Sequence, residues 1–424
     1  MAAFFGASHE VVHAAPVACP SNLPGSVAFA SPDGLILCRS GDPPVIVTQR
    51  TDATAIAFTR GANWLQFRSG GALHVYDIAR CQENIVPDYA PYCPEPLPMC
   101  TRSQRTPDGR WLLHAKEGQA LPNGLPGPAT LLASNGALLV QVHASDGDDL
   151  DLAGVAPGGG TALFWIDPQH SASLMSDTVP LGMIALSAVR HNITVQLPRI
   201  VPSVVALFPI TGYPLRDWIS FAPNGSAFAA IAGETREVFY SEHLVRCTVR
   251  EAQCEQWNHK PGFVELDPAM SPSAEYVAFV RAVELHAGDG PSTIAAWQTW
   301  SNTRQLVLAA TNPSKSPVTV SEAGGDVSSP TWITANRLLF ISHDRLREFD
   351  LNSRRIRYLA NLADRGIGYY GYVARSDRFA WATNGRTPDR ISRQCRVSHA
   401  PLRDRCALKS DPKVTRLARA PGLR

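Results

Sequence analysis

Several features that would assign this 424-residue chain to a common functional class are missing from its sequence. No stretch of 18 apolar residues occurs, so we expect no transmembrane helix. No two cysteines have the Cys-x-x-Cys spacing, which argues against a zinc knuckle. The Gly-x-Ser-x-Gly motif is absent, and with it the nucleophile elbow of a serine hydrolase. Only 18% of the residues are charged while 45% are hydrophobic, a composition that excludes an intrinsically disordered chain.

Turn-forming residues are plentiful, with 34 prolines and 31 glycines, and they predict many short elements joined by turns. The clearest turns are Thr-Pro-Asp-Gly at 106–109 and Ala-Pro-Asn-Gly at 222–225, each followed by a short apolar strand with an aromatic residue. Proline fixes φ at the first corner, Asp or Asn tolerates the left-handed region, and glycine supplies a positive φ. Degenerate versions of this turn begin near Thr59, Pro157, Ser271, Ile333 and Arg375.

These seven turns recur every 40 to 65 residues, a period that fits one four-stranded sheet per repeat. A single sheet of this kind cannot bury both of its faces, so neighbouring sheets must stack. We therefore predict an all-β fold, a β-propeller of about seven four-stranded blades. The propeller would span 25–412, after a leader or disordered segment at 1–24 and before a basic tail at 413–424. An additional Ser-Pro-Asp-Gly turn at 31–34, which we expect to belong to strands that close the ring with the C-terminal segment, leaves eight blades as the alternative.

The Pro-Asp-Gly turn followed by a small-apolar-aromatic strand resembles the repeat of the TolB-like, or WD40-like, β-propellers. The resemblance extends loosely over most of the chain, but no residues remain for the N-terminal α/β domain that TolB carries. Propellers of this kind are similar to one another across periplasmic scaffold proteins, propeller peptidases and secreted proteins. The resemblance therefore implies a fold and no particular activity.

Nine cysteines point to disulfides and hence to an oxidising compartment. Cys247 and Cys254 flank six residues that form a predicted tight hairpin, which would place the two sulfurs opposite each other across the strand pair. Two further pairs are predicted, one in the corresponding part of a later repeat and one in a proline-rich loop: Cys395–Cys406 and Cys93–Cys100. The sequence assigns no partner to Cys19, Cys38 and Cys81.

We expect a secreted or periplasmic protein, although its first residues match a signal peptide poorly. Residues 1–15 lack a basic beginning, and polar residues interrupt their apolar run. Either a leader was removed or lies upstream, or a remnant ends near Ala15. Residues 16–19 also resemble a poor lipobox, which would place a lipid on Cys19.

The net charge of +2 conceals an uneven distribution of charge along the chain. Residues 337–424 hold 18 arginines and two lysines against eight carboxylates, a net charge of +12, so the first 336 residues carry −10. Such a basic segment could attract an anionic partner, for example a phospholipid head group or a polysaccharide. The alternative is that the basic blades complement acidic neighbours in a closed ring. Nucleic acid is the least favoured partner, because neither an aromatic-rich RNA motif nor a helical DNA reader accompanies the charge.

Two patterns resemble metal sites. His-Glu-x-x-His at 9–13 has the spacing of a zinc motif, but no adequate helix can form before Pro16 and no third ligand follows, so we interpret it as a chance match. Asp146, Asp148 and Asp151 are weak calcium candidates, although their segment departs from an EF-hand loop and a solvated acidic loop is the alternative. We expect no other cofactor. The remaining histidines are dispersed through the repeats, and each is expected to be structural or at the surface.

These observations favour a non-enzymatic binding scaffold outside the cytoplasm, a monomer that holds a protein, glycan or anionic ligand. The alternative is a propeller hydrolase or lyase that acts on polysaccharide, with histidines and carboxylates converging in the central channel. An anion-binding surface on the arginine-rich C-terminal blades is compatible with either function.

Overall fold

The computed structural model describes residues between Cys19 and Thr383, with gaps. The described ranges are 19, 23–40, 42–59, 63–86, 102–105, 111–115, 129–133, 138–144, 149–157, 160–167, 178–185, 193–197, 205–212, 219–234, 237–257, 259–286, 288–312, 315–320, 323–363 and 378–383. They belong to a unit formed by Met1–Thr387, while a second unit, Pro388–Arg424, lies outside them. No helix within these ranges is long and apolar enough to span a bilayer.

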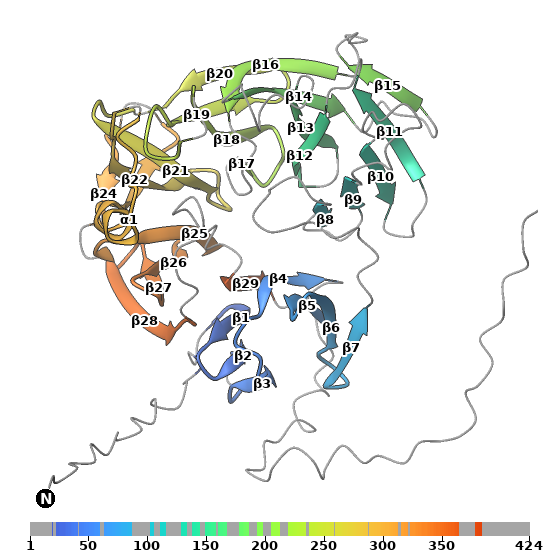
Figure 1. Cartoon of the computed structure of the whole chain (residues 1–424), viewed down its shortest axis with the longest axis vertical. Coiled ribbons are helices and arrows are strands. Elements are labelled where there is room, and N and C mark those ends of the chain that lie inside the picture. The colour runs from blue at the N-terminus through green and yellow to red at the C-terminus, as the bar shows by residue number, and fades with distance from the viewer. Residues whose placement is uncertain are drawn as a thin grey trace, which may run out of the picture. The chain divides into compact units, whose positions relative to one another are not determined.

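The described residues form seven β-sheets, of which six are four-stranded and antiparallel. In four sheets the strands follow one another in chain order (Figure 1). Sheet B contains β4 (Thr54–Thr59), β5 (Trp64–Ser69), β6 (Ala72–Asp77) and β7 (Gln82–Val86). Sheet E contains β17 (Ile219–Phe221), β18 (Ala227–Ala232), β19 (His243–Thr248) and β20 (Gln253–Gln256). Sheet F contains β21 (Phe263–Met270), β22 (Tyr276–Val283), β23 (Gln305–Ala310) and β24 (Val318–Thr319), and sheet G contains β25 (Val327–Thr334), β26 (Arg337–Ser342), β27 (Arg345–Asp350) and β28 (Arg355–Asn361).

The other three sheets depart from simple chain order. Sheet D contains β12 (Asp149–Val155), β13 (Thr161–Asp167), β14 (Val179–Ala185) and β16 (Val205–Gly212). Sheet C is five-stranded, with β8 (Arg102–Arg105), β9 (Trp111–Ala115), β10 (Ala129–Ala133), β11 (Leu138–Ala144) and β15 (Ile193–Leu197), the last parallel to β11. Sheet A contains β1 (Gly25–Ser31), β2 (Gly34–Arg39) and β3 (Val45–Thr48), together with β29 (Phe379–Thr383).

Neighbouring sheets meet through their first strands. Strand β12 contacts β17, β17 contacts β21, β21 contacts β25, β25 contacts β29, and β29 contacts β4. From each of these strands the sheet extends outward to a last strand that lies at its edge (Figure 1). This stacking of four-stranded meanders is the architecture of a β-propeller, which confirms the predicted all-β fold class.

Sheet A joins the two ends of the described chain. Strand β29 pairs antiparallel with β1, so Phe379 lies opposite Phe29, as we predicted for the segment that closes the ring. The Ser-Pro-Asp-Gly turn at 31–34 connects β1 to β2 within this sheet. Ser31 Oγ donates to the carbonyl of Gly34 across it. The predicted extension of the propeller to residue 412 falls outside the described residues.

The turn at 222–225 shows why the repeat motif predicts hairpins. The Gly225 amide donates to the Ala222 carbonyl over 2.8 Å, and Gly225 has φ +68°, a conformation that glycine adopts without strain. Strand β18 follows at once, with Phe228 fully buried. The turn predicted at 106–109 lies outside the described residues.

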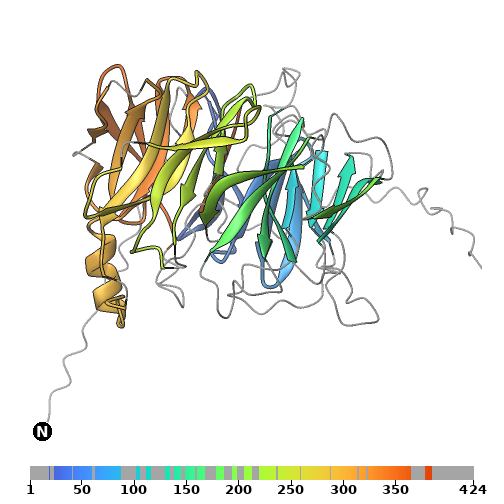
Figure 2. The ribbon, with the colours of Figure 1, turned by 90° about the horizontal axis from the view of Figure 1, so that it is seen from above.

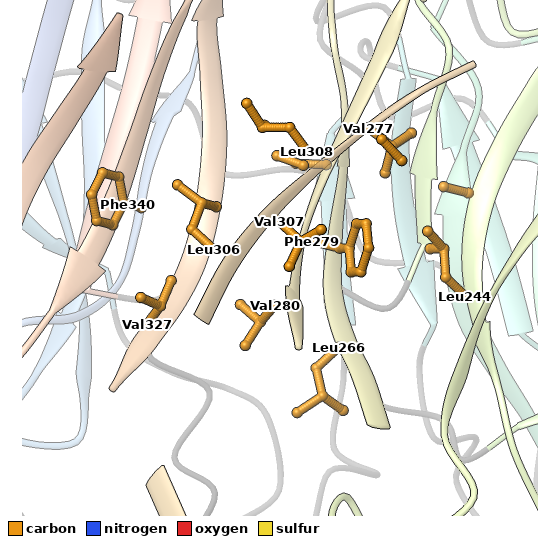
Figure 3. Packing of buried hydrophobic residues seen from close by; sticks show 14 of the residues in the cluster. Leu244, Leu266, Val277, Phe279, Val280, Leu306, Val307, Leu308, Val327 and Phe340 are labelled. Carbon is orange, nitrogen blue, oxygen red and sulfur yellow. The ribbon is translucent and has the colours of Figure 1, made fainter. Parts of the chain in front are cut away.

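The core lies between the sheets and not within any one of them. In β22, the side chains of Val277, Phe279 and Val280 are all fully buried, although neighbours along a strand point to opposite faces. Sheets E and G cover the two faces of sheet F, and Figure 3 shows Leu244 and Phe340 packed into the same cluster. Burial on both faces explains why the central strands are continuous apolar runs.

One helix interrupts the repeat between β22 and β23. Helix α1 (Ile294–Ser301) begins at Thr293, whose hydroxyl accepts from the Ala296 amide. Figure 2 shows that the helix extends beyond the ends of the strands. Trp300 anchors it: the indole is buried and donates to the Val283 carbonyl over 2.8 Å. This helix was not expected from the repeat pattern of the sequence.

Candidate functional site

The outer hairpin of sheet G, β27 and β28 with their connecting turn, carries five arginines. Strands β27 and β28 pair antiparallel, with Arg347 opposite Tyr358 and Asp350 opposite Arg355. Leu346 and Phe349 are buried and fix the hairpin on the propeller, while four arginines of the hairpin are exposed: Arg345, Arg354, Arg355 and Arg357. Asp350 shapes the connecting turn, because its Oδ1 accepts from the Ser353 amide over 2.7 Å.

An open cavity of about 940 Å³ lies on this hairpin. Its lining consists of five arginines, one carboxylate and three other residues: Arg345, Arg347, Arg354, Arg355, Arg357, Asp350, Ser353, Ile356 and Tyr358. We call this set the arginine hairpin. Tyr358 is 56% exposed, so an aromatic ring stands beside the guanidinium groups. The lining is therefore suited to an anionic molecule that also has an apolar part.

Three of the arginines form no ion pair among the described residues, although Asp350 lies opposite Arg355 in the strand register. These are Arg345, Arg354 and Arg355, and all three are exposed. Arg347 is half-buried and donates to the Ala323 carbonyl over 3.4 Å. Its pKa is lowered by burial first and by the charge of Arg345 second. Like charges are thus held close together, an arrangement that a bound anion would stabilise.

A buried carboxylate fixes the base of the hairpin. Glu348 is fully buried and accepts from two arginines, at 2.7 Å from Arg337 Nε and 2.8 Å from Arg357 Nη2. Burial raises the pKa of Glu348, but the hydrogen bonds and charges of Arg337 and Arg357 outweigh it, and the net shift is downward. Two guanidinium groups share one carboxylate here, so the group keeps a positive charge and Arg357 is held in place.

Comparisons with known proteins found similar solved structures at low sequence identity. No protein-family model matches the sequence, and no curated protein matches it. Among solved structures, the chain is similar to a putative TolB from Agrobacterium tumefaciens, at 13% identity and a TM-score of 0.38 over 81% of this chain and 92% of that one. It is also similar to an oligogalacturonate lyase in complex with manganese, at 9% identity and a TM-score of 0.47 over 76% and 79%. A hydrazine synthase from Kuenenia stuttgartiensis shares 11% identity, with a TM-score of 0.43 over 72% and 78%.

In fold, the chain is a β-propeller, and its repeat resembles that of the TolB-like propellers. The strand order and the stacking of the sheets carry this statement, and the solved structures add no argument about activity. The sites that the sequence singled out can now be placed on this propeller.

The predicted cysteine pairs fall on both described and undescribed parts of the propeller. Cys247 on β19 and Cys254 on β20 lie opposite each other in the register and are joined by a disulfide, with Cα atoms 4.0 Å apart. Such a bridge ties the exposed edge strand β20 to its sheet. The other two predicted pairs lie outside the described residues: Cys395–Cys406 and Cys93–Cys100.

A disulfide that the sequence did not assign joins Cys19 to Cys38. It fastens the segment before β1 to β2, where Leu23 is buried in the core shared by sheets A and G. In this state the Cys19 sulfur is not free to carry a lipid, which argues against the lipobox interpretation. Cys81 is also disulfide-bonded.

Only one of the three weak calcium candidates, Asp151, lies within the described residues. Asp151 lies within β12, opposite Trp165, and not in a loop. Asp146 and Asp148 lie outside the described residues. Across the described ranges, no three His, Cys, Asp or Glu side chains are grouped so that they could hold a metal ion.

One histidine that the sequence did not single out, His74, is buried in sheet B. His74 Nδ1 lies 2.5 Å from Glu83 Oε1, its Nε2 lies 3.1 Å from the Ser69 carbonyl, and its ring stacks on Phe67 with centroids 4.9 Å apart. The side chain of His74 is fully buried. These contacts join β5, β6 and β7, so we interpret His74 as structural. An isolated histidine at an inward position of an alternating strand was the only sequence signal for it.

Proposed function

We propose that this TolB-like propeller is a non-enzymatic binding scaffold outside the cytoplasm, and that the arginine hairpin holds an anionic partner. The observation that carries the proposal is the group of arginines without an ion pair among the described residues, Arg345, Arg354 and Arg355, around one cavity. Each guanidinium presents a planar set of donors that matches carboxylate, sulfate or phosphate.

The site is built to keep its charge without a ligand. Glu348 orients Arg357, and Asp350 shapes the turn that carries Arg354. The pKa of Asp350 is lowered, chiefly by the amide of Ser353, so this carboxylate stays ionised and keeps the turn in place at neutral pH. Preorganised donors lose less conformational entropy on binding than free side chains do.

The proposed location is supported by the two disulfides that the structure describes in full, Cys19–Cys38 and Cys247–Cys254. Structural disulfides persist in secreted and periplasmic proteins and are rare in the reducing cytosol. Mass spectrometry of the unreduced protein isolated from its natural compartment tests this part of the proposal. Finding these four thiols free would contradict it.

Binding to labelled heparin, a sulfated polysaccharide, tests the anion site. We expect the variant R345Q/R354Q/R355Q to bind about tenfold more weakly than wild type, because three exposed charge contacts at about 0.5 kcal/mol each correspond to that factor. The control R80Q/R250Q/K260Q removes the same charge from exposed positions in the turns after β6 and β19 and in the segment before β21. We expect it to bind like wild type. Equal losses in the two variants, or no loss in the first, would overturn the proposal.

A further inference from the structure

Strand β28 offers an open edge as well as a cluster of charges. It is the last strand in the order β25-β26-β27-β28, and no strand pairs with its outer side in the described residues (Figure 1). Residues Arg355–Asn361 are hydrogen-bonded to β27 on one side only. Every second amide and carbonyl of an edge strand points away from the sheet, where another chain can pair with it.

The side chains of β28 alternate in chemistry from face to face. Arg355 and Arg357 occupy one face, two residues apart, which corresponds to about 6.7 Å along a strand. Ile356 and Tyr358 occupy the other face, opposite Phe349 and Arg347 of β27. A strand added beside β28 would therefore meet Arg355 and Arg357 on one face, and Ile356 and Tyr358 with the neighbouring Arg347 on the other.

This alternation selects the kind of chain that can pair here. A second copy of β28 would bring arginine against arginine, and like charges placed opposite each other across a strand pair are unfavourable. A strand with carboxylates at alternate positions would instead place them beside Arg355 and Arg357. A polysaccharide or a lipid head group could contact the guanidinium groups but would leave the strand's amides and carbonyls unused.

We propose that the partner of the arginine hairpin is an extended acidic peptide segment, added as a further strand along β28. This inference rests on the proposed function, since it names the anion that the site holds. The peptide would gain main-chain hydrogen bonds from the edge, charge pairing from the arginines, and side-chain contacts at Ile356 and Tyr358.

Two labelled peptides test the inference on the full-length protein. The first has glutamate at every second position with valine and threonine between, and the second is identical except for N-methylation of the amides along one edge. We expect the first peptide to bind. The N-methylated peptide should bind at least about tenfold more weakly, because it keeps the charge but cannot form the main-chain hydrogen bonds of strand pairing. Hydrogen exchange should show that the amides of 355–361 become protected when the first peptide binds.

Charge reversal supplies the variant and its control. R355E should no longer bind the glutamate peptide, and it should gain affinity for the same peptide with lysine in place of glutamate. The matched variant R250E, in the turn after β19, should behave like wild type.

The outcomes separate the inference from the proposed function. Equal binding of the two glutamate peptides, or binding of heparin without either peptide, would overturn strand addition while leaving an anion site. If neither heparin nor the peptides bind and the arginine variants behave like wild type, both the inference and the proposed function are overturned. A further outcome is that the β28 amides become protected without peptide, to an extent that rises with protein concentration. That result would show that a second copy of the chain pairs with β28, and it would also overturn the inference.

Discussion

Replacing Glu242 with glutamine should remove a specific pH dependence from the stability of the protein. Glu242 precedes β19, is fully buried, and neither of its carboxyl oxygens has a hydrogen-bond partner among the described residues. Its carboxyl group packs against Gly233, where a Cβ would lie only 2.3 Å from Oε2. Burial raises the pKa of Glu242 well above its ordinary value of 4.5.

The sign and size of the effect follow from proton linkage. Below pH 4.5 the folded and unfolded chains both hold the proton, and the buried acid contributes its full stability. Above pH 4.5 the unfolded chain releases the proton while the folded chain keeps it, so stability falls by about 1.4 kcal/mol per pH unit until the folded pKa is reached. Glutamine is neutral throughout and shows no such loss. The stability of E242Q relative to wild type should therefore rise with pH, from near zero at about pH 4 to about 1.4 kcal/mol at about pH 5.5.

Urea denaturation of wild type and E242Q at intervals between pH 4 and 7 measures this difference. The control is E234Q, because Glu234 is a nearby but exposed residue and its replacement should leave the pH profile unchanged. Parallel profiles for wild type and E242Q, or an E242Q protein that loses stability relative to wild type as pH rises, would refute the reasoning.

Three other predictions concern the stability of the protein at Glu348, at Gly34 and at the Cys19–Cys38 bridge. E348Q should cost about 3 kcal/mol at neutral pH, because it removes the fully buried negative charge that pairs with Arg337 and Arg357. Since the folded pKa of Glu348 is lowered, wild type should lose this advantage as pH falls, which the same urea series would detect. G34A should cost more than about 3 kcal/mol, because Gly34 has φ +121° and a Cβ there would lie 2.1 Å from the Thr48 carbonyl, whereas G71A, with open space at its Cβ, should cost about 1 kcal/mol by urea denaturation. Removal of the Cys19–Cys38 bridge in the double alanine variant should cost about 3 kcal/mol through the unfolded chain, seen as a lower Tm, and an unchanged Tm would contradict this.

The fold was predictable where local chemistry decides the backbone. The proline, asparagine and glycine at 222–225 form the same turn in any context that permits a hairpin, so the repeat could be counted from such turns. Helix α1 could not be predicted, because its residues do not favour a helix strongly. Burial of Trp300 against β22 and its bond to Val283 stabilise it, and these are tertiary contacts.

The candidate site was predictable only as an excess of charge. The sequence places many arginines after residue 337, but the positions that share a face depend on the pairing of β27 with β28, which shifts register after Leu346. That Glu348 is buried between Arg337 and Arg357, while Arg355 stays unpaired, follows from that register. The Cys19–Cys38 bridge escaped prediction for a related reason, since Cys19 reaches Cys38 only when the segment before β1 packs on sheet A.

The salt dependence of heparin binding tests the central claim most directly. Each guanidinium that neutralises an anionic group releases about one counterion, so the slope of log Kd against log salt concentration counts the contacts. We predict a slope for wild type that is about three units steeper than the slope for R345Q/R354Q/R355Q. Identical slopes for the two proteins would show that the arginine hairpin does not bind the anion, and would contradict the account.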